Sequence, residues 1–253
     1  MKKPDFKLMK KVNKIIAELF LEMEDVIKEG ITTKELDKWA EDFIRNRDAV
    51  PAFKGYRGFP ATLCVSINNE IIHGIPSEKR IIRKGDLVSI DVGAVKKKHY
   101  ADAARTFIVG STSFENRRLA NVTRKALDIG IQQAVAGNRI GDIGNAVQTY
   151  VEKNEFNVVR EFVGHGIGRQ MHLEPAIPNY GEKDKGPLIK EGMCLAIEPM
   201  VVAGSYEVKI LDDQWTAVTV DGKNAAHFEN TIYVSEDGPI VLTEINKGDY
   251  ARK

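Results

Sequence analysis

Apolar residues near the start of the chain recur at the spacing of one helical face. They run from Val12 to Met23 within the segment Lys7–Ile27, which predicts an amphipathic helix that ends before Gly30. Thr32 and Glu35 then form a capping-box pattern, which predicts a second helix with an apolar face of its own. We interpret both helices as scaffold.

After Pro51 the pattern changes to short apolar runs separated by turn residues. Residues 53–59, rich in glycine and aromatics, are interpreted as a loop, and residues 116–136 and 140–153 as two more helices. The expected strands are 62–67, 87–95, 100–109, 158–163, 193–201, 207–210, 216–220 and 227–234. The order of helices, strands, helices, strands predicts an α+β fold with two related halves. We expect one domain over residues 1–253, in which residues 1–50 form the helical start.

Composition narrows the function class. The 253 residues carry a net charge of +1, which gives no reason to expect a nucleic-acid or membrane-surface binder. Two cysteines, Cys64 and Cys194, exclude a disulfide scaffold and favour a reducing, cytoplasmic compartment. The N-terminus lacks the apolar core of a signal peptide. No run of about 18 apolar residues occurs, so we expect no transmembrane helix.

Four acidic residues interrupt apolar strands. They are Asp91, Asp102, Glu198 and Glu229. Any one of them could be a surface acid or half of a salt bridge, and Asp102 has Arg105 close by in the sequence. Four buried carboxylates on one domain would repel one another unless cations neutralise them, so together they indicate a metal site.

The two aspartates are expected to meet across a hairpin. If the turn lies near residues 96–98, Asp91 and Asp102 are roughly opposite, with Cβ atoms about 5 Å apart. A divalent cation between them would reverse their repulsion. The three lysines of the turn could supply countercharge, although solvation at the tip is the preferred interpretation.

Three of the five histidines, His73, His165 and His172, lie beside glycine or in glycine-rich segments, where ligands can approach closely. His99 and His227 are interpreted as hydrogen-bonded structural residues. The glycines around His165 do not fit a dinucleotide motif. Two Asp, two Glu and one His suit hard or borderline divalent ions, and five ligands suit two ions that share bridging carboxylates.

These motifs resemble the type I methionine aminopeptidases of the pita-bread metallopeptidase superfamily, over about residues 6–248. The resemblance implies a curved antiparallel sheet covered by helices, with two pseudo-symmetric halves. The motifs that carry it are Ser66-Ile67-Asn68, His73-Gly74-Ile75-Pro76, Asp91-Val92-Gly93 with Asp102, Gly164-His165-Gly166-Ile167-Gly168 with His172, Ile197-Glu198-Pro199-Met200 and Glu229-Asn230-Thr231. It implies these metal ligands: Asp91, Asp102, His165, Glu198 and Glu229.

The resemblance also implies a methionine pocket and a mechanism. Aromatic and sulfur-bearing residues would line the pocket, although each could instead be plain core packing: Tyr56, Phe59, Cys64, Phe162 and Trp215. Phe53, Phe162 and Leu173 depart from common family residues. Two divalent ions (Co, Mn, Fe(II) or Zn) would activate a bridging water, with His73, His172 and Glu198 as catalytic residues and the two histidines also binding substrate.

The implied activity is removal of the N-terminal methionine from peptides and nascent proteins. We expect a cytoplasmic monomer with no membrane or specific nucleic-acid partner, and a ribosome contact is left open. Two alternatives remain: an Xaa-Pro peptidase of the same superfamily, disfavoured because only about 50 residues precede Pro51, and a non-catalytic binding homologue, disfavoured by the complete ligand set.

Overall fold

The computed structural model describes residues 4–245, so both expected ends of the domain and the expected end of the family resemblance near residue 248 lie outside the described residues. The first helix, α1 (Phe6–Val26), begins where the Asp5 side chain accepts a hydrogen bond from the Leu8 amide. The second, α2 (Thr33–Arg45), begins with the predicted capping box of Thr32 and Glu35, whose backbone amides each donate to the other residue's side chain. Both predicted helices are therefore confirmed.

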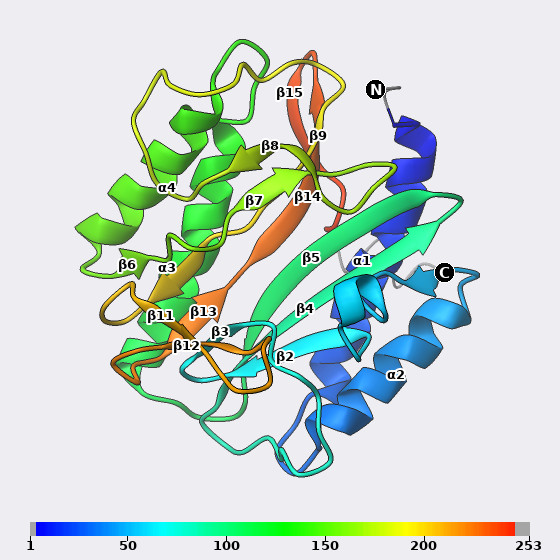
Figure 1. Ribbon diagram of the computed structural model, residues 1–253, viewed down its shortest axis with the longest axis vertical. Coiled ribbons are helices and arrows are strands. Elements are labelled where there is room, and N and C mark those ends of the chain that lie inside the picture. The colour runs from blue at the N-terminus through cyan, green and yellow to red at the C-terminus, as the bar shows by residue number, and fades with distance from the viewer. Residues whose placement is uncertain (1–3, 246–253) are drawn as a thin grey trace.

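A nine-stranded antiparallel sheet forms the centre of the molecule (Figure 1). Its main order is β1-β4-β5-β14-β9-β7-β8, with β2 also on β4 and β15 also on β14. The bounds are β1 (Val50–Pro51), β2 (Leu63–Ile67), β4 (Leu87–Lys96), β5 (His99–Ile108), β7 (Gly164–Gly166), β8 (Leu173–Ile177), β9 (Cys194–Ile197), β14 (Glu229–Ser235) and β15 (Gly238–Val241). The pairing of β5 with β14 joins the early strands to the late ones.

The described region also contains two three-stranded sheets and a 3₁₀ turn. One sheet has the order β13-β10-β6 and the other β11-β12-β3. Their bounds are β3 (Glu70–Ile72), β6 (Asn157–Val158), β10 (Met200–Val202), β11 (Val208–Ile210), β12 (Ala217–Thr219) and β13 (Ala225–His227). The 3₁₀ turn η1 (Tyr56–Gly58) lies in the predicted aromatic loop.

Two pairs of helices pack on the large sheet, at opposite sides of it in Figure 1. Apolar residues of α1 and α2 form one core with β2, β4 and β5. The helices α3 (Phe114–Gln132) and α4 (Ile140–Lys153) form a second core with β9 and β14. The chain therefore runs twice through two helices followed by strands, as the sequence predicted for an α+β fold. No helix within residues 4–245 is long and apolar enough to cross a membrane.

The register of the central hairpin differs from the expected one. Lys96 pairs with His99 across a two-residue turn, and both turn residues, Lys97 and Lys98, have positive φ. This register pairs Asp91 with Ala104 and Gly93 with Asp102. The two aspartates are therefore diagonal rather than opposite neighbours, which still leaves their side chains on one face of the sheet.

Three strand predictions were wrong in their boundaries. The predicted strand 158–163 is a strand only at residues 157–158, and β7 begins afterwards at Gly164. The predicted strand 193–201 is split at Glu198–Pro199 into β9 and β10, since proline has no amide hydrogen for the ladder. The strand expected at 227–234 is split at Phe228 into β13 and β14. The last two breaks lie at or beside predicted metal ligands.

Candidate metal centre

The five predicted metal ligands line one cavity of about 170 Å³. Asp91 and Asp102 come from the hairpin β4–β5, and His165 comes from β7. Glu198 directly follows β9, and Glu229 begins β14. The cavity is lined by Phe53, Tyr56, Arg57, Phe59, Cys64, His73, Asp91, Asp102, His165, Met171, His172, Glu198, Trp215 and Glu229.

Three of these side chains converge most tightly. Asp102, His165 and Glu229 each offer one ligand atom, and these atoms lie within 4.8 Å of one another. Thr231 fixes Asp102 relative to β14, because its hydroxyl donates to the Asp102 carbonyl at 2.8 Å and accepts from the Asp102 amide at 3.3 Å. The spacing of Asp102 and Glu229 is therefore set by the pairing of β5 with β14 together with this contact of the Thr231 side chain.

His165 is oriented as a metal-binding imidazole would be. Its Nδ1 donates to the Gly166 carbonyl at 3.0 Å, which leaves the lone pair on Nε2. Nε2 faces Asp102 Oδ2 at 3.8 Å and Glu198 Oε1 at 3.7 Å. Burial lowers the pKa of His165 to about 4, so the ring is neutral and free to coordinate.

The carboxylates are electrostatically unfavourable as a group. Burial raises the pKa of Asp91 to about 7. Burial, followed by the charges of neighbouring carboxylates, raises the pKa of each of the other three acids well above its ordinary value. Without a cation, this site therefore retains protons at pH values where exposed acids have lost them.

The side chains present fit a bound cation. Asp91 Oδ1, Asp102 Oδ1 and Glu229 Oε1 are buried and have no hydrogen-bond partner within the described chain. Unpaired buried carboxylate oxygens are costly, and a divalent ion satisfies several of them at once. One neutral imidazole with carboxylate oxygens suits Mn, Fe(II), Co or Zn.

His73 is held at the rim of the site in a strained conformation. It has a φ of +60°, which is uncommon for a residue other than glycine. Gly74 lets the backbone after His73 approach β2 closely, because a Cβ there would lie 2.2 Å from the Val65 carbonyl oxygen. The His73 ring packs edge-on against Phe162 and Trp215, at centroid distances of 5.6 and 6.2 Å. Burial lowers the pKa of His73 to about 4, so its ring is neutral.

His172 lies next to His165, with ring centroids 4.3 Å apart. Its Nδ1 is 2.9 Å from the Tyr56 hydroxyl. Burial, and then the charge of Arg57, lowers the pKa of His172. A neutral ring whose Nδ1 accepts from Tyr56 carries its proton on Nε2, which can then donate to another group.

Apolar side chains close one side of the cavity. Phe59, Cys64 and Trp215 belong to one packed cluster, together with half-buried Tyr56. Phe59 meets Trp215 edge-on at 5.1 Å. Phe162 is outside the cavity lining and instead supports His73. The structure therefore brings every predicted site residue except Phe162 to this cavity, and Phe162 packs against His73 from outside it.

Sequence reasoning missed three residues beside the site: Arg57, Met171 and His227. Arg57 and Met171 line the cavity. His227 Nε2 lies 3.7 Å from Glu198 Oε2. Its position two residues before Glu229 was a signal that it could share a face with that acid.

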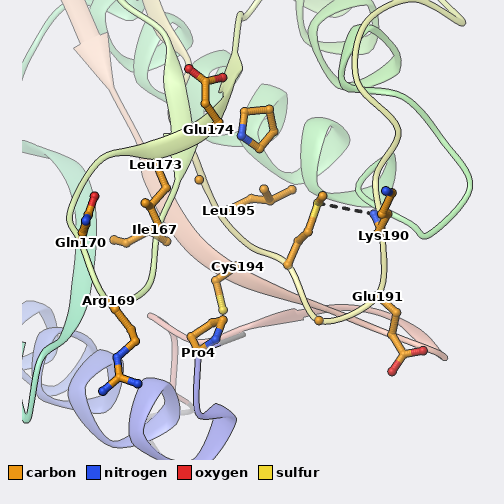
Figure 2. Close-up of a pocket in the computed structure, with 14 residues that line it drawn as sticks. Pro4, Ile167, Arg169, Gln170, Leu173, Glu174, Lys190, Glu191, Cys194 and Leu195 are labelled. Atoms are coloured by element: carbon orange, nitrogen blue, oxygen red, sulfur yellow. Dashed lines mark hydrogen bonds between the residues drawn. The ribbon is translucent and has the colours of Figure 1, made fainter. Parts of the chain in front are cut away.

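A larger cavity of about 630 Å³ lies elsewhere, next to β7, β8 and β9. Figure 2 shows its lining, in which the carboxyl groups of Glu174 and Glu191 point outward from apolar side chains such as Ile167 and Leu195. None of the predicted site residues lines it. The candidate site is therefore the smaller cavity with the converging ligands.

Comparisons with known proteins agree with this geometry. Residues 7–236 match metallopeptidase family M24. The chain is 50% identical over 238 residues to methionine aminopeptidase 1 of Bacillus subtilis, covering 94% of this chain and 96% of that one. It is 48% identical over 239 residues to a methionine aminopeptidase of Clostridium acetobutylicum, covering 94% and 96%.

A solved structure gives the same result. The crystal structure of a methionine aminopeptidase from Thermotoga maritima superposes with a TM-score of 0.93 at 44% identity, covering 94% of this chain and 96% of that one. This similarity confirms the expected pita-bread fold, with its curved antiparallel sheet covered by helices.

Proposed function

Since the chain belongs to metallopeptidase family M24, we propose that it removes the N-terminal methionine from peptides and nascent proteins by metal-dependent hydrolysis. It is a hydrolase of the aminopeptidase class, as its relatives are. The observation that carries the proposal is the buried convergence of Asp102, His165 and Glu229 in a cavity that also holds Asp91 and Glu198.

The cofactor we propose is a pair of divalent ions, Co, Mn, Fe(II) or Zn. Asp91, Asp102, His165, Glu198 and Glu229 would hold them. Bound ions of this kind lower the pKa of a water molecule and polarise a carbonyl oxygen. The unpaired oxygens of three of these acids support this assignment.

The chain's own groups would move the protons. Glu198, whose pKa is raised by burial, would take the proton of the attacking water. His172 would donate from Nε2 to the oxygen of the tetrahedral intermediate, because Tyr56 occupies its Nδ1. Neutral His73 would hydrogen-bond the scissile nitrogen and help the amine to leave.

The apolar side of the cavity supports methionine as the first residue of the substrate. The whole cavity has a volume of about 170 Å³, which is below that of most drug-sized ligand sites, so its apolar side suits a single side chain. Aromatic rings and the Cys64 sulfur suit a flexible thioether. The methionine side chain would be contacted by Tyr56, Phe59, Cys64 and Trp215. Phe162 would contribute to substrate binding by holding the His73 ring in place.

We further propose that the chain is one catalytic domain and acts as a cytoplasmic monomer. The packing of α1 and α2 on β4 and β5 supports the single domain. The buried free thiols of Cys64 and Cys194 fit a reducing compartment. On nascent chains, contact with the ribosome would bring the protein to its substrate.

Cleavage of the peptide Met-Gly-Met-Met tests the proposal. Purified protein should release methionine when Mn²⁺, Co²⁺ or Fe²⁺ is added, lose that activity after thorough chelation and regain it when metal is restored. Ala-Pro peptides are the matched control substrate, and their preferred cleavage would support an Xaa-Pro peptidase instead. Methionine release that survives chelation would contradict the metal mechanism.

A further inference from the structure

His227 is buried at the break between β13 and β14, with 1% of its surface exposed. Its backbone is fixed by Thr106 of β5. The His227 amide donates to the Thr106 hydroxyl at 2.9 Å, and that hydroxyl donates to the His227 carbonyl at 2.9 Å. The direction of the His227 side chain is therefore set by the large sheet, as is that of the metal ligands.

The imidazole points at one oxygen of Glu198. His227 Nε2 has no hydrogen-bond partner within the described chain, and Glu198 Oε2 lies 3.7 Å from it. The other oxygen, Oε1, lies 3.7 Å from His165 Nε2. The Glu198 carboxylate therefore lies between two imidazoles: that of His165, a predicted metal ligand, faces Oε1, and that of His227 faces Oε2.

We propose that His227 is a positioning residue, which donates its Nε2–H to Glu198 Oε2 and so directs Oε1 toward the metal ions. This inference rests on the proposed function, because it assigns a role to the same metal site. A movement that shortens the 3.7 Å separation to about 3 Å completes the hydrogen bond. Hydrogen bonds of this kind fix the orientation of metal ligands and raise their affinity for the ion.

Packing alone does not account for a histidine at this position. The surroundings of β13 and β10 are apolar, including Met200, which pairs with His227 across the strands. An aliphatic side chain would fill such a space without leaving a buried nitrogen unpaired, whereas an unpaired imidazole nitrogen is costly. A bond to Glu198 removes that cost.

Three substitutions separate hydrogen bonding from packing. Gln places its amide nitrogen near the position of the imidazole Nε2, Asn places it near Nδ1, and Leu supplies no donor. We expect His227→Leu and His227→Asn to weaken Mn²⁺ binding roughly 10-fold to 100-fold. We expect His227→Gln to remain within about threefold of the unsubstituted protein. Isothermal titration of the metal-free full chain with Mn²⁺ measures these dissociation constants.

A buried histidine away from the site serves as the matched control. His99 is 2% exposed, and its two ring nitrogens meet the Lys97 carbonyl and the Asp5 amide. His99→Leu should lower the melting temperature and leave the Mn²⁺ dissociation constant unchanged. Thermal unfolding of all variants separates loss of stability from loss of metal affinity.

The outcomes are distinct. Mn²⁺ affinity of His227→Leu equal to that of the unsubstituted protein would overturn the inference, as would equal affinities for the Gln and Asn variants. If the Leu variant does not fold, the comparison of Gln with Asn still decides. Absence of Mn²⁺ binding by the unsubstituted protein would overturn the proposed function and this inference together, whereas unchanged binding in the variants overturns only the inference.

Discussion

The cost of burying the Asp91 carboxylate should make the free energy of unfolding of the metal-free protein depend on pH. Burial raises the pKa of Asp91 in the folded state to about 7, against an ordinary value of 3.8. Between these values the folded chain holds a proton that the unfolded chain has lost. This group therefore destabilises the fold increasingly as pH rises toward 7, and its effect is constant above that pH.

The magnitude follows from the difference in pKa. From pH 5 to pH 7 the interval is two units, which corresponds to about 3 kcal/mol of unfolding free energy. Asp91→Asn removes this titration. It also removes a charge that raises the pKa values of Asp102, Glu198 and Glu229, which acts in the same direction. The stability of Asp91→Asn relative to the unsubstituted protein should therefore increase by about 3 kcal/mol or more between pH 5 and pH 8.

Urea unfolding in the presence of a chelator, followed by tryptophan fluorescence at several pH values, measures this difference. The histidines with lowered pKa values titrate in both proteins and largely cancel in the comparison. Asp142→Asn is the control, because backbone amides of Arg139 and Asp184 lower the pKa of Asp142. Its effect on stability should be constant from pH 5 to pH 8. A stability difference for Asp91→Asn that stays flat or shrinks over this range would refute the reasoning.

Three further predictions concern single side chains. Asp102→Asn should reduce Met-Gly-Met-Met cleavage at least about 100-fold and weaken Mn²⁺ binding, and calorimetry showing unchanged affinity would argue against its role as a ligand. Tyr56→Phe should lower kcat roughly threefold to tenfold, since it removes a hydroxyl 2.9 Å from His172 Nδ1; wild-type kinetics would mean that this contact is dispensable. Gly166→Ala places a Cβ 2.4 Å from the Glu174 carbonyl oxygen and should lower the melting temperature by roughly 5 °C. Gly168→Ala, where the nearest atom is 3.3 Å away, should cost less, and the reverse order would contradict the packing argument.

Local signals predicted most of the helical structure. The segment predicted as a helix at 140–153 is α4 with the same bounds, because its apolar period and its flanking residues agree. The capping box of Thr32 and Glu35 marked the start of α2 correctly. These features depend on interactions between residues close in sequence, so they can be predicted from the local residue pattern.

Features set by tertiary packing could not be predicted in detail. The diagonal placement of Asp91 and Asp102 depends on the turn residues Lys97 and Lys98 both adopting positive φ, which the sequence pattern did not indicate. The proximity of His227 to Glu198 arises because β13 pairs with β10, bringing together residues far apart in the chain. The acids within apolar strands indicated a metal site from the residues alone, whereas the roles of the five ligands followed from the family resemblance.

The pairing of β5 with β14 determines how cleavage of the chain would affect activity. Asp91 and Asp102 precede the connection at residues 109–113, whereas the other three predicted ligands follow it. Two residue pairs and the hydroxyl of Thr231 align the two groups. Neither stretch of chain alone carries a complete set, so a polypeptide cleaved in that connection would be inert until its fragments reassociated. Recovery of activity would then depend on fragment concentration.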